Sequence, residues 1–308
     1  MIEDYPKHLM EFERRFSSEA ACRDSLARLR WPEGFCCPRC GHRRSWPIGN
    51  FRFQCANCDY QVSVTAGTIF QDSHKPLSLW FRAIWWITSQ KTGASALGLQ
   101  ENLGLGSYRT AWTWLHKLRR AMVRPGRDRL SGRVEVDETY YGGHEDGALG
   151  RGAEKKTLIA IAVEERGAGL GRIRMKRVRD ASAQSLQSFV TEAVEPGSIV
   201  HTDGWDGYTG LERKGYGHEV TVLKGRKEPA AELLPRVHLV ASLLVRWLMG
   251  THQGAVRREY LDYYLDEFTF RFNRRTSRYR GKLFYRLLQQ AAGVDPVPYR
   301  QMVNHASD

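Results

Sequence analysis

The sequence contains no run of the roughly 18 apolar residues that a helix needs to cross a bilayer. We therefore expect no membrane-spanning segment. The first residues, MIEDYPKHLMEFERRF, also lack the basic and then apolar pattern of a secretory signal, so we expect a cytoplasmic protein. In that reducing compartment the six cysteines should be free thiols or metal ligands rather than disulfides.

Acidic residues are scarce relative to basic ones. The chain has 34 Asp and Glu against 47 Lys and Arg, a formal net charge of +13, and a pI of about 9.6. This excess of positive charge favours a polyanionic partner over a merely basic surface. At 308 residues the chain has room for two or three domains.

Four of the six cysteines form two closely spaced pairs, Cys37 with Cys40 and Cys55 with Cys58. The spacing C-x₂-C-x₁₄-C-x₂-C predicts a zinc ribbon over residues 31–70, in which four thiolates hold a structural Zn²⁺. Metal binding would supply on the order of 10 kcal/mol of folding free energy. A redox role for the pairs is the alternative. Cys36 is a second candidate for the first ligand, but Cys37 preserves the C-x₂-C spacing.

Helical patterns flank this segment. Residues 1–30 show apolar residues at helical spacing, with Cys22 as an expected core thiol, and residues 76–123 predict a helix-turn-helix region. An aromatic stretch over residues 77–88 reads as a core helix, and Gly104-Leu-Gly106 forms the turn. Ser107 should cap the following helix, which would offer polar and basic groups to DNA: Tyr108, Arg109, Thr113, His116, Lys117, Arg119 and Arg120. The alternative is a helical hairpin that binds nothing.

Residues 132–143 combine the composition of a strand with the acids Glu135, Asp137 and Glu138. Such a run of acids is costly to bury unless a positive group neutralises it, and a divalent metal is the first candidate. Two further strands, a helix and a short strand ending in Asp203 follow, and then a fifth strand and a helix from about Pro235. This order predicts an RNase H-like domain over residues 130–290.

In that fold the first and fourth strands are neighbours, so Asp137 and Asp203 should meet. Two carboxylates there can hold Mg²⁺ or Mn²⁺ for phosphoryl transfer. For either aspartate alone, a turn or cap residue would be the simpler interpretation. The overall fold class is therefore α+β and multidomain: a zinc ribbon, a helical region and an RNase H-like domain with a mixed five-stranded sheet, followed by an uninformative tail over 291–308.

Several motifs together resemble the ISXO-like group of bacterial insertion-sequence transposases over roughly residues 25–290. The motifs are the ribbon with its lead Trp31-Pro-Glu-Gly34, and residues 134–143, 201–205, 246–254 and 264–275. The resemblance implies a DDE-type transposase that binds the terminal repeats, cleaves 3′ ends and transfers the strand to target DNA with two divalent metals. It implies at least a dimer on DNA and association with the nucleoid.

The resemblance also implies Asp137 and Asp203 as the first two metal ligands. A third ligand, Asn or Glu, usually lies five residues after the His that opens the last helix, and a Lys follows it. Here Leu243 and Val245 occupy those positions. Either His238 or Glu267 replaces the third ligand, or the register is wrong by a turn, or the chain is an inactive copy that still binds DNA.

Basic residues near the C-terminal motifs are expected to contact the DNA backbone: Arg246 in the Lys role, and Arg274 and Arg275 in a basic cluster. For Glu267 the simpler interpretation is a partner for Arg271 at i+4. The chemistry needs no covalent intermediate. The rival functions are a DNA-binding protein without activity, such as a regulator or an inactivated transposase, and a nuclease that cuts without joining.

Overall fold

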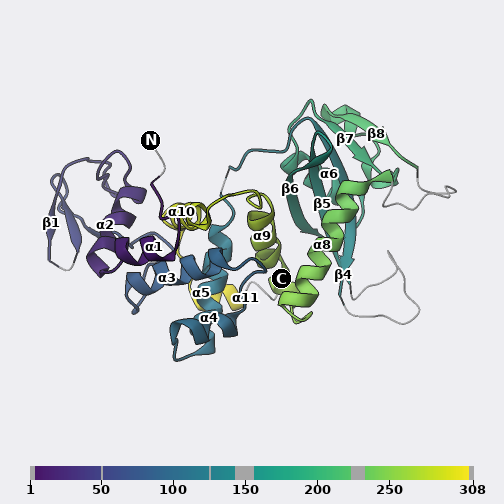
Figure 1. The fold of residues 1–308 in the computed structure, drawn as a ribbon. Coiled ribbons are helices and arrows are strands. Elements are labelled where there is room, and N and C mark those ends of the chain that lie inside the picture. Colours follow the sequence, from purple (N-terminus) through teal and green to yellow (C-terminus); the bar gives the residue numbers. More distant parts are fainter. Residues whose placement is uncertain (1–3, 50, 125, 143–155, 223–232, 305–308) are drawn as a thin grey trace. The chain divides into compact units, whose positions relative to one another are not determined.

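The computed structural model describes residues 4–49, 51–124, 126–142, 156–222 and 233–304 (Figure 1). The chain forms two compact units, Met1–Arg124 with Thr276–Asp308, and Pro125–Arg275. The second unit ends before residue 290, the boundary that we expected from the sequence. Residues beyond 275 return to the first unit, where α10 packs on α3. The glycine-rich loop at 142–156 lies almost entirely outside the described residues.

The first unit is mainly helical. Its helices are α1 (Leu9–Arg15), α2 (Glu19–Arg30), α3 (Leu77–Ser89), α4 (Ala96–Leu103), α5 (Tyr108–Ala121), α10 (Arg280–Ala291) and α11 (Tyr299–Asn304). The aromatic helix α3 is its core, as predicted, because the Trp80 ring stacks on Trp114 with centroids 3.7 Å apart. Cys22 is fully buried, as expected of a core thiol.

The connection between α4 and α5 has the predicted turn. Gly104 ends α4 in the left-handed conformation, with φ of 60°, which glycine adopts without steric cost. Ser107 is the N-cap residue of α5, but its side chain makes no capping hydrogen bond, contrary to expectation.

The ribbon contains a three-stranded antiparallel sheet, β1 (Ser45–Ile48), β2 (Arg52–Cys55) and β3 (Gln61–Ser63). β2 and β3 lie where the sequence has short β-like runs, around residues 51–54 and 60–64, whereas no such run predicts β1. Arg30 of α2 donates hydrogen bonds of 2.8 and 2.9 Å to the carbonyls of Ser63 and Val64, which fastens the sheet to that helix.

The second unit is built on a mixed sheet in the order β6-β5-β4-β7-β8. Its strands are β4 (Arg133–Tyr141), β5 (Thr157–Arg166), β6 (Gly169–Val178), β7 (Ile199–Thr202) and β8 (Gly217–Val220). The β4–β7 and β7–β8 pairs are parallel and the others antiparallel. The predicted RNase H-like arrangement is confirmed, since the first and fourth strands are neighbours.

Helices cover both faces of this sheet (Figure 1). On one face α6 (Ala183–Ala193) buries Leu186 and Val190 against Val134 and Val136, with the short 3₁₀ helices Asp206–Tyr208 and Leu211–Lys214 alongside. On the other face lie α8 (Pro235–Thr251) and, after the 3₁₀ turn Arg258–Tyr260, α9 (Leu261–Phe272). Within the described ranges, no helix has the length and apolar character required to span a bilayer.

Candidate functional site

The acidic residues of β4 point to different faces of the sheet because side chains alternate along a strand. Val134 and Val136 belong to the core under α6, whereas Tyr141 belongs to the core under α8 and α9. By this alternation Glu135 and Asp137 face α8, and Glu138 faces the α6 side. Glu135 and Asp137 therefore share the face covered by α8, and Glu138 lies on the opposite face.

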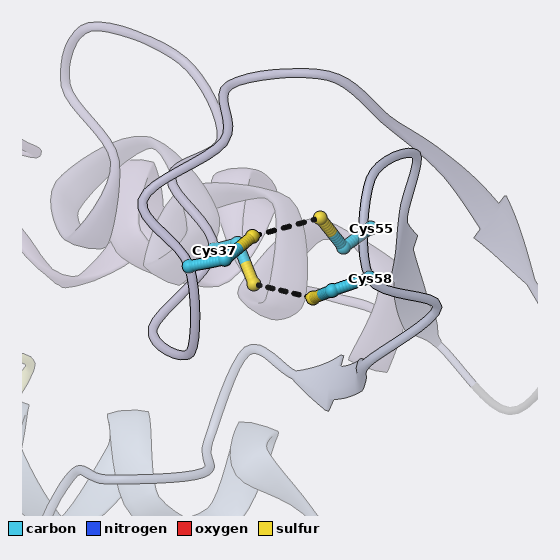
Figure 2. A group of neighbouring side chains, drawn as sticks. Cys37, Cys55 and Cys58 are labelled. Atoms are coloured by element: carbon cyan, nitrogen blue, oxygen red, sulfur yellow. Dashed lines mark hydrogen bonds between the residues drawn. The ribbon is translucent and has the colours of Figure 1, made fainter.

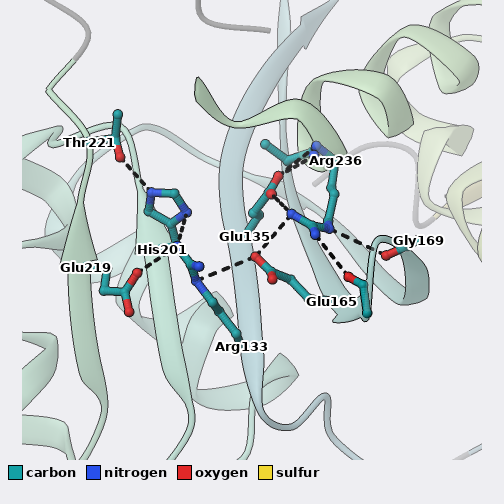
Figure 3. A network of polar contacts seen from close by, with 10 residues as sticks. Arg133, Glu135, Glu165, Gly169, His201, Glu219, Thr221 and Arg236 are labelled. Carbon is teal, nitrogen blue, oxygen red and sulfur yellow. Dashed lines mark hydrogen bonds and ion pairs between the residues drawn. The ribbon is translucent and has the colours of Figure 1, made fainter. Parts of the chain in front are cut away.

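Glu135 is neutralised without a metal. Its carboxylate, only 1% exposed, accepts hydrogen bonds of 2.8 and 2.9 Å from the backbone N–H groups of Arg236 and Val237 in the first turn of α8. The Arg236 guanidinium adds an ion pair of 2.9 Å (Figure 3). The N-cap residue of α8, Leu234, supplies no side-chain hydrogen bond. Glu135, which lies on β4, caps the start of the helix in its place.

Glu135, Glu165 and His201 form a cluster whose possible ligand atoms lie within 4.8 Å of one another. Two arginines form ion pairs with this cluster: Arg236 lies 3.3 Å from Glu165, and Arg133 lies 3.5 Å from Glu165. The imidazole of His201 contacts Arg133 at 3.2 Å and Thr221 at 2.7 Å (Figure 3). Burial and the Arg133 charge lower the pKa of His201. We interpret the cluster as an ion-pair network rather than a cation site.

Asp137 and Asp203 belong to neighbouring strands. The parallel register pairs Glu135 of β4 with His201 of β7, and Asp137 and Asp203 each follow two residues after this last pair. Both carboxylates are close enough to Tyr208 for their charges to raise the pKa of its hydroxyl. Asp203 follows directly after the end of β7 and accepts a 3.0 Å hydrogen bond from the Trp205 backbone N–H. The two aspartates that the sequence predicted as ligands thus follow the paired segments of neighbouring strands, and their role as ligands stays a prediction.

His238 of α8 completes this group. Its Nε2 atom lies 3.7 Å from Asp137 Oδ2, is buried, and has no hydrogen-bond partner among the described residues. Burial lowers the pKa of His238, although the charges of Glu135 and Asp203 act in the opposite direction. An imidazole nitrogen that has no hydrogen-bond partner and lies beside the Asp137 carboxylate, with the Asp203 charge near enough to act on it, is a donor set that fits a divalent cation.

Glu138, on the opposite face, accepts a 2.9 Å hydrogen bond from the hydroxyl of Tyr208. Tyr208 is fully buried, and burial followed by the Glu138 charge holds the pKa of its hydroxyl well above the usual value. The segment from Asp203 to Tyr208 is also held by Trp205, whose indole N–H donates to the Ala181 carbonyl at 2.7 Å. Trp205 thus has a packing role in this turn, and the Glu138 carboxylate is bound by Tyr208 on the face away from Asp137.

Glu267 is not brought to this group. It is fully buried in α9, where Arg271 donates to it at 2.9 and 2.7 Å. Helix α9 packs on β6, which is separated from β4 by β5. The simpler interpretation of an i+4 ion pair therefore describes Glu267, and of the two replacements for the third ligand only His238 lies beside Asp137. Leu243 packs against the core of this face.

The four predicted zinc ligands converge in the ribbon (Figure 2). The Sγ atoms of Cys37 and Cys58 are 3.7 Å apart, those of Cys40 and Cys55 are 3.6 Å apart, and all four lie within 4.8 Å of one another. Four sulfurs held about 2.3 Å from one zinc ion would be roughly 3.8 Å apart in a tetrahedron. The spacing fits Zn²⁺ and is too long for disulfides.

The thiols of this cluster differ in how readily they lose a proton. The backbone N–H of His42 lowers the pKa of Cys40 to about 6. For Cys58 the Tyr60 backbone N–H lowers the pKa, but burial and the contact with Cys40 outweigh it and raise the pKa to about 12. Cys36 is exposed and lies outside the cluster, with its thiol directed to the Gly41 carbonyl. The structure thus brings Cys37, and not Cys36, to the other three ligands.

The basic residues expected to contact DNA differ in exposure. Arg119 is 1% exposed and donates to the Ala94 carbonyl, and Lys117 is partly buried and donates to the Ile69 carbonyl. The expectation that they face a DNA groove is therefore wrong for Arg119 and weakened for Lys117, because the second half of α5 is core; His116 is buried too. Arg109 and Tyr108 remain exposed at the start of α5, and Arg120 is partly exposed.

The C-terminal basic cluster is likewise divided. Arg246 is exposed on α8, and Arg274 is partly exposed above the Phe270 ring. The guanidinium of Arg275 instead donates to the carbonyls of Leu170, Gly171 and Phe272, so its main role is structural. The neighbouring Phe268, Phe270 and Phe272 are buried.

Two residues of the site were missed by sequence reasoning, Arg236 and Tyr208. The signal for Arg236 was a helix start, Leu-Pro-Arg, that lacks an acidic or hydroxyl cap and so needs one from elsewhere. The sequence offered no comparable signal for the Tyr208–Glu138 bond, because it joins distant segments across the sheet.

Comparison with known proteins agrees with this architecture. Residues 129–273 match the family described as ISXO2-like transposase domain, and residues 17–61 match the transposase zinc-ribbon domain. A protein of Halobacterium salinarum, described as an uncharacterized protein in transposable element ISH50, is 27% identical over 282 residues, which cover 84% of this chain and 92% of that protein. The two family matches together span more than half of the chain, which therefore belongs to the transposases that combine a zinc ribbon with an ISXO2-like transposase domain.

Proposed function

We propose that this protein binds the terminal repeats of an insertion sequence, cleaves the 3′ ends and joins them to target DNA in a metal-dependent reaction. One observation carries the proposal: the Nε2 atom of His238, which has no hydrogen-bond partner among the described residues, lies 3.7 Å from Asp137 on the strand next to the one that leads into Asp203. Carboxylates on neighbouring strands suit phosphoryl transfer because they can hold two divalent cations near one phosphate.

Asp137, Asp203 and His238 would hold these cations. Bound divalent metal would lower the pKa of the attacking oxygen and stabilise the leaving one. The chain's own contribution is to fix the donor atoms. The Glu138 backbone N–H donates to Asp137 at 2.8 Å, and the Trp205 backbone N–H donates to Asp203 at 3.0 Å. An imidazole among carboxylates occurs in dimanganese sites, so we propose that Mn²⁺ supports activity better than Mg²⁺.

DNA binding would use cations that the fold leaves at the surface. Among the predicted residues, Arg109, Arg246 and Arg275 are exposed, although Arg275 also donates to backbone carbonyls, and Arg120 and Arg274 are partly exposed. The ribbon adds Arg39, Arg44 and Arg52, which are exposed and make no ion pair within the described part of the chain. Trp46, 46% exposed on the same sheet, offers a flat apolar surface beside them. These groups suit phosphate contacts, which dominate affinity for duplex DNA.

Zn²⁺ would have a structural role, because four thiolates leave no open coordination position. Since two transposon ends must be held together, we propose at least a dimer on DNA, acting in the cytoplasm at the nucleoid. The DNA would therefore be both the substrate and the template of assembly.

One observation favours a second function, DNA binding without cleavage. Leu243 and Val245 lie where relatives are expected to have a third ligand and a Lys, and neither side chain can bind a metal or a phosphate. In that case the ribbon and the helical unit would act alone, as in a regulator or an inactivated transposase.

A strand-transfer assay on DNA with the element's own ends separates the two functions. We expect Mn²⁺-dependent joined product with the wild type and its loss with Asp137→Ala and with Asp203→Ala. End binding without nicks or joints would favour the DNA-binding function, and nicks without joined product would indicate a nuclease.

A further inference from the structure

We propose that Glu135 and Glu138, the acids on either side of Asp137, are positioning residues for the metal site. Glu135 fixes the helix that carries His238, and Glu138 fixes, through Tyr208, the segment that begins with Asp203. The inference rests on the proposed function, because it assigns these residues to the Asp137, Asp203 and His238 site.

The first contact joins β4 to α8. Two backbone N–H groups and one guanidinium converge on the buried Glu135 carboxylate at 2.8 to 2.9 Å. Hydrogen bonds to a charged group are roughly twice as strong as neutral ones, and this carboxylate also interacts with the positive end of the helix. Glu135 thus sets the position of the first turn of α8 relative to β4.

That first turn determines where His238 lies. His238 follows the bonded residue Val237 directly, and a helix is too stiff to shift one residue without its neighbour. Glu135 and Asp137 are two residues apart on the same face of β4. The strand therefore fixes the contact of Glu135 with the helix relative to the contact of Asp137 with the imidazole. The 3.7 Å separation between His238 and Asp137 is a consequence of this geometry.

The second contact works from the other face of the sheet. The Tyr208 hydroxyl donates to Glu138, the residue next to Asp137, at 2.9 Å. Tyr208 ends the short 3₁₀ helix that follows Asp203, and it is fully buried. Glu138 therefore holds the turn after β7 against β4, and this turn carries Asp203.

The two contacts can be weakened without removing a ligand. Glu135→Gln keeps the shape of the side chain but removes its charge, and Tyr208→Phe removes one hydroxyl. Loss of groups that orient metal ligands typically weakens metal binding by about 10- to 100-fold. We expect each variant to raise the Kd for Mn²⁺ by that factor.

Two residues of the same unit provide matched controls. Glu164 of β5 also accepts hydrogen bonds from an arginine and from backbone N–H groups, those of Arg172 and Ser131. Tyr216 is also buried, and its hydroxyl donates to the Val194 carbonyl. Glu164→Gln and Tyr216→Phe should lower stability in a comparable way and leave the Kd for Mn²⁺ unchanged.

The experiment is a calorimetric titration of the zinc-loaded full chain with Mn²⁺, together with thermal unfolding of each variant. Weaker Mn²⁺ binding in Glu135→Gln and Tyr208→Phe, but not in the controls, supports the inference. Unchanged binding in both variants overturns it, and so does equal weakening in the controls, which would indicate a general loss of stability.

A second readout needs no metal. The imidazole ¹⁵N resonances of His238, assigned with His238→Gln, should move in metal-free Glu135→Gln and stay in place in Glu164→Gln. If Asp137→Asn leaves Mn²⁺ binding unchanged, the proposed metal site is wrong. In that case the His238 resonances alone test whether Glu135 positions His238. If they do not move in Glu135→Gln, that role of Glu135 is overturned.

Discussion

The imidazole of His238 lies 3.7 Å from the carboxylate of Asp137, although one belongs to a helix and the other to the central strand of the sheet. The contact makes His238 the candidate for the third ligand, which the family resemblance implies at the position of Leu243. It also distinguishes His238 from Glu267, whose carboxylate pairs with Arg271.

Replacement of Glu267 should affect stability and not metal binding. Glu267→Gln leaves the Arg271 guanidinium, 12% exposed, without its charged partner, and breaking a buried pair costs about 3 to 5 kcal/mol. Urea unfolding should show this loss, while the Kd for Mn²⁺ of the folded variant stays at the wild-type value. The comparison variant His238→Gln should show the reverse, and a loss of Mn²⁺ binding confined to Glu267→Gln would make Glu267 the ligand.

The ribbon should depend on Cys55 and not on Cys36. Cys55→Ser removes one of four converging sulfurs, whereas Cys36→Ser changes an exposed thiol outside the cluster. Native mass spectrometry should find one Zn²⁺ per chain in the wild type and in Cys36→Ser, and reduced occupancy in Cys55→Ser. Loss of zinc in Cys36→Ser would mean that Cys36 is a ligand.

Glu19 should make the stability of the helical unit dependent on pH. Burial raises the pKa of Glu19, but the hydrogen bonds from the backbone N–H groups of Ser78 and Leu77 lower it by more. The net pKa therefore lies below the usual value. A lowered pKa in the folded state stabilises the protein above the unfolded-state pKa of roughly 4.3. This contribution disappears as the pH falls through the folded-state pKa.

The matching variant is Glu19→Gln, which should be less stable by about 1 kcal/mol at pH 7 because α3 loses an acid at its N-terminus. Denaturant unfolding from pH 7 to pH 3 should show the difference from the wild type shrinking below pH of about 4. A difference that grows with acidity would contradict this assignment.

Duplex DNA binding should depend on exposed arginines of the ribbon. Arg52→Ala should reduce the slope of log K against log salt concentration by about 0.9, the value for one phosphate contact. The comparison variant is Lys117→Met, since Lys117 is partly buried and donates to the Ile69 carbonyl. Fluorescence anisotropy at several salt concentrations gives both slopes. A larger effect of Lys117→Met than of Arg52→Ala would indicate that α5, and not the ribbon, contacts the DNA.

Local patterns in the sequence predicted much of the fold. The cysteine spacing predicted the ribbon, and the order of strands and helices predicted which strands are neighbours, so that Asp137 and Asp203 could be paired before any coordinates. These features depend on periodicity, turn chemistry and chain connectivity, which are readable from neighbouring residues.

The partners of single side chains were harder to predict. Nothing near Glu135 in the sequence indicates that the start of α8 neutralises it, and α5 reads as a basic helix although Arg119 is buried. Both depend on tertiary packing, which decides whether a charge faces solvent, a helix end or another charge. The strand β1 was missed because Pro47 and a short length weaken its signal.

The most direct test of the metal site is a crystal structure of the zinc-loaded protein soaked with Mn²⁺, with anomalous scattering to locate the ion. The account predicts a manganese peak in contact with Asp137, Asp203 and His238, at metal-to-oxygen distances near 2.2 Å, roughly those of small divalent cations. A peak on Glu135, Glu165 and His201, or no peak beside Asp137, would contradict it.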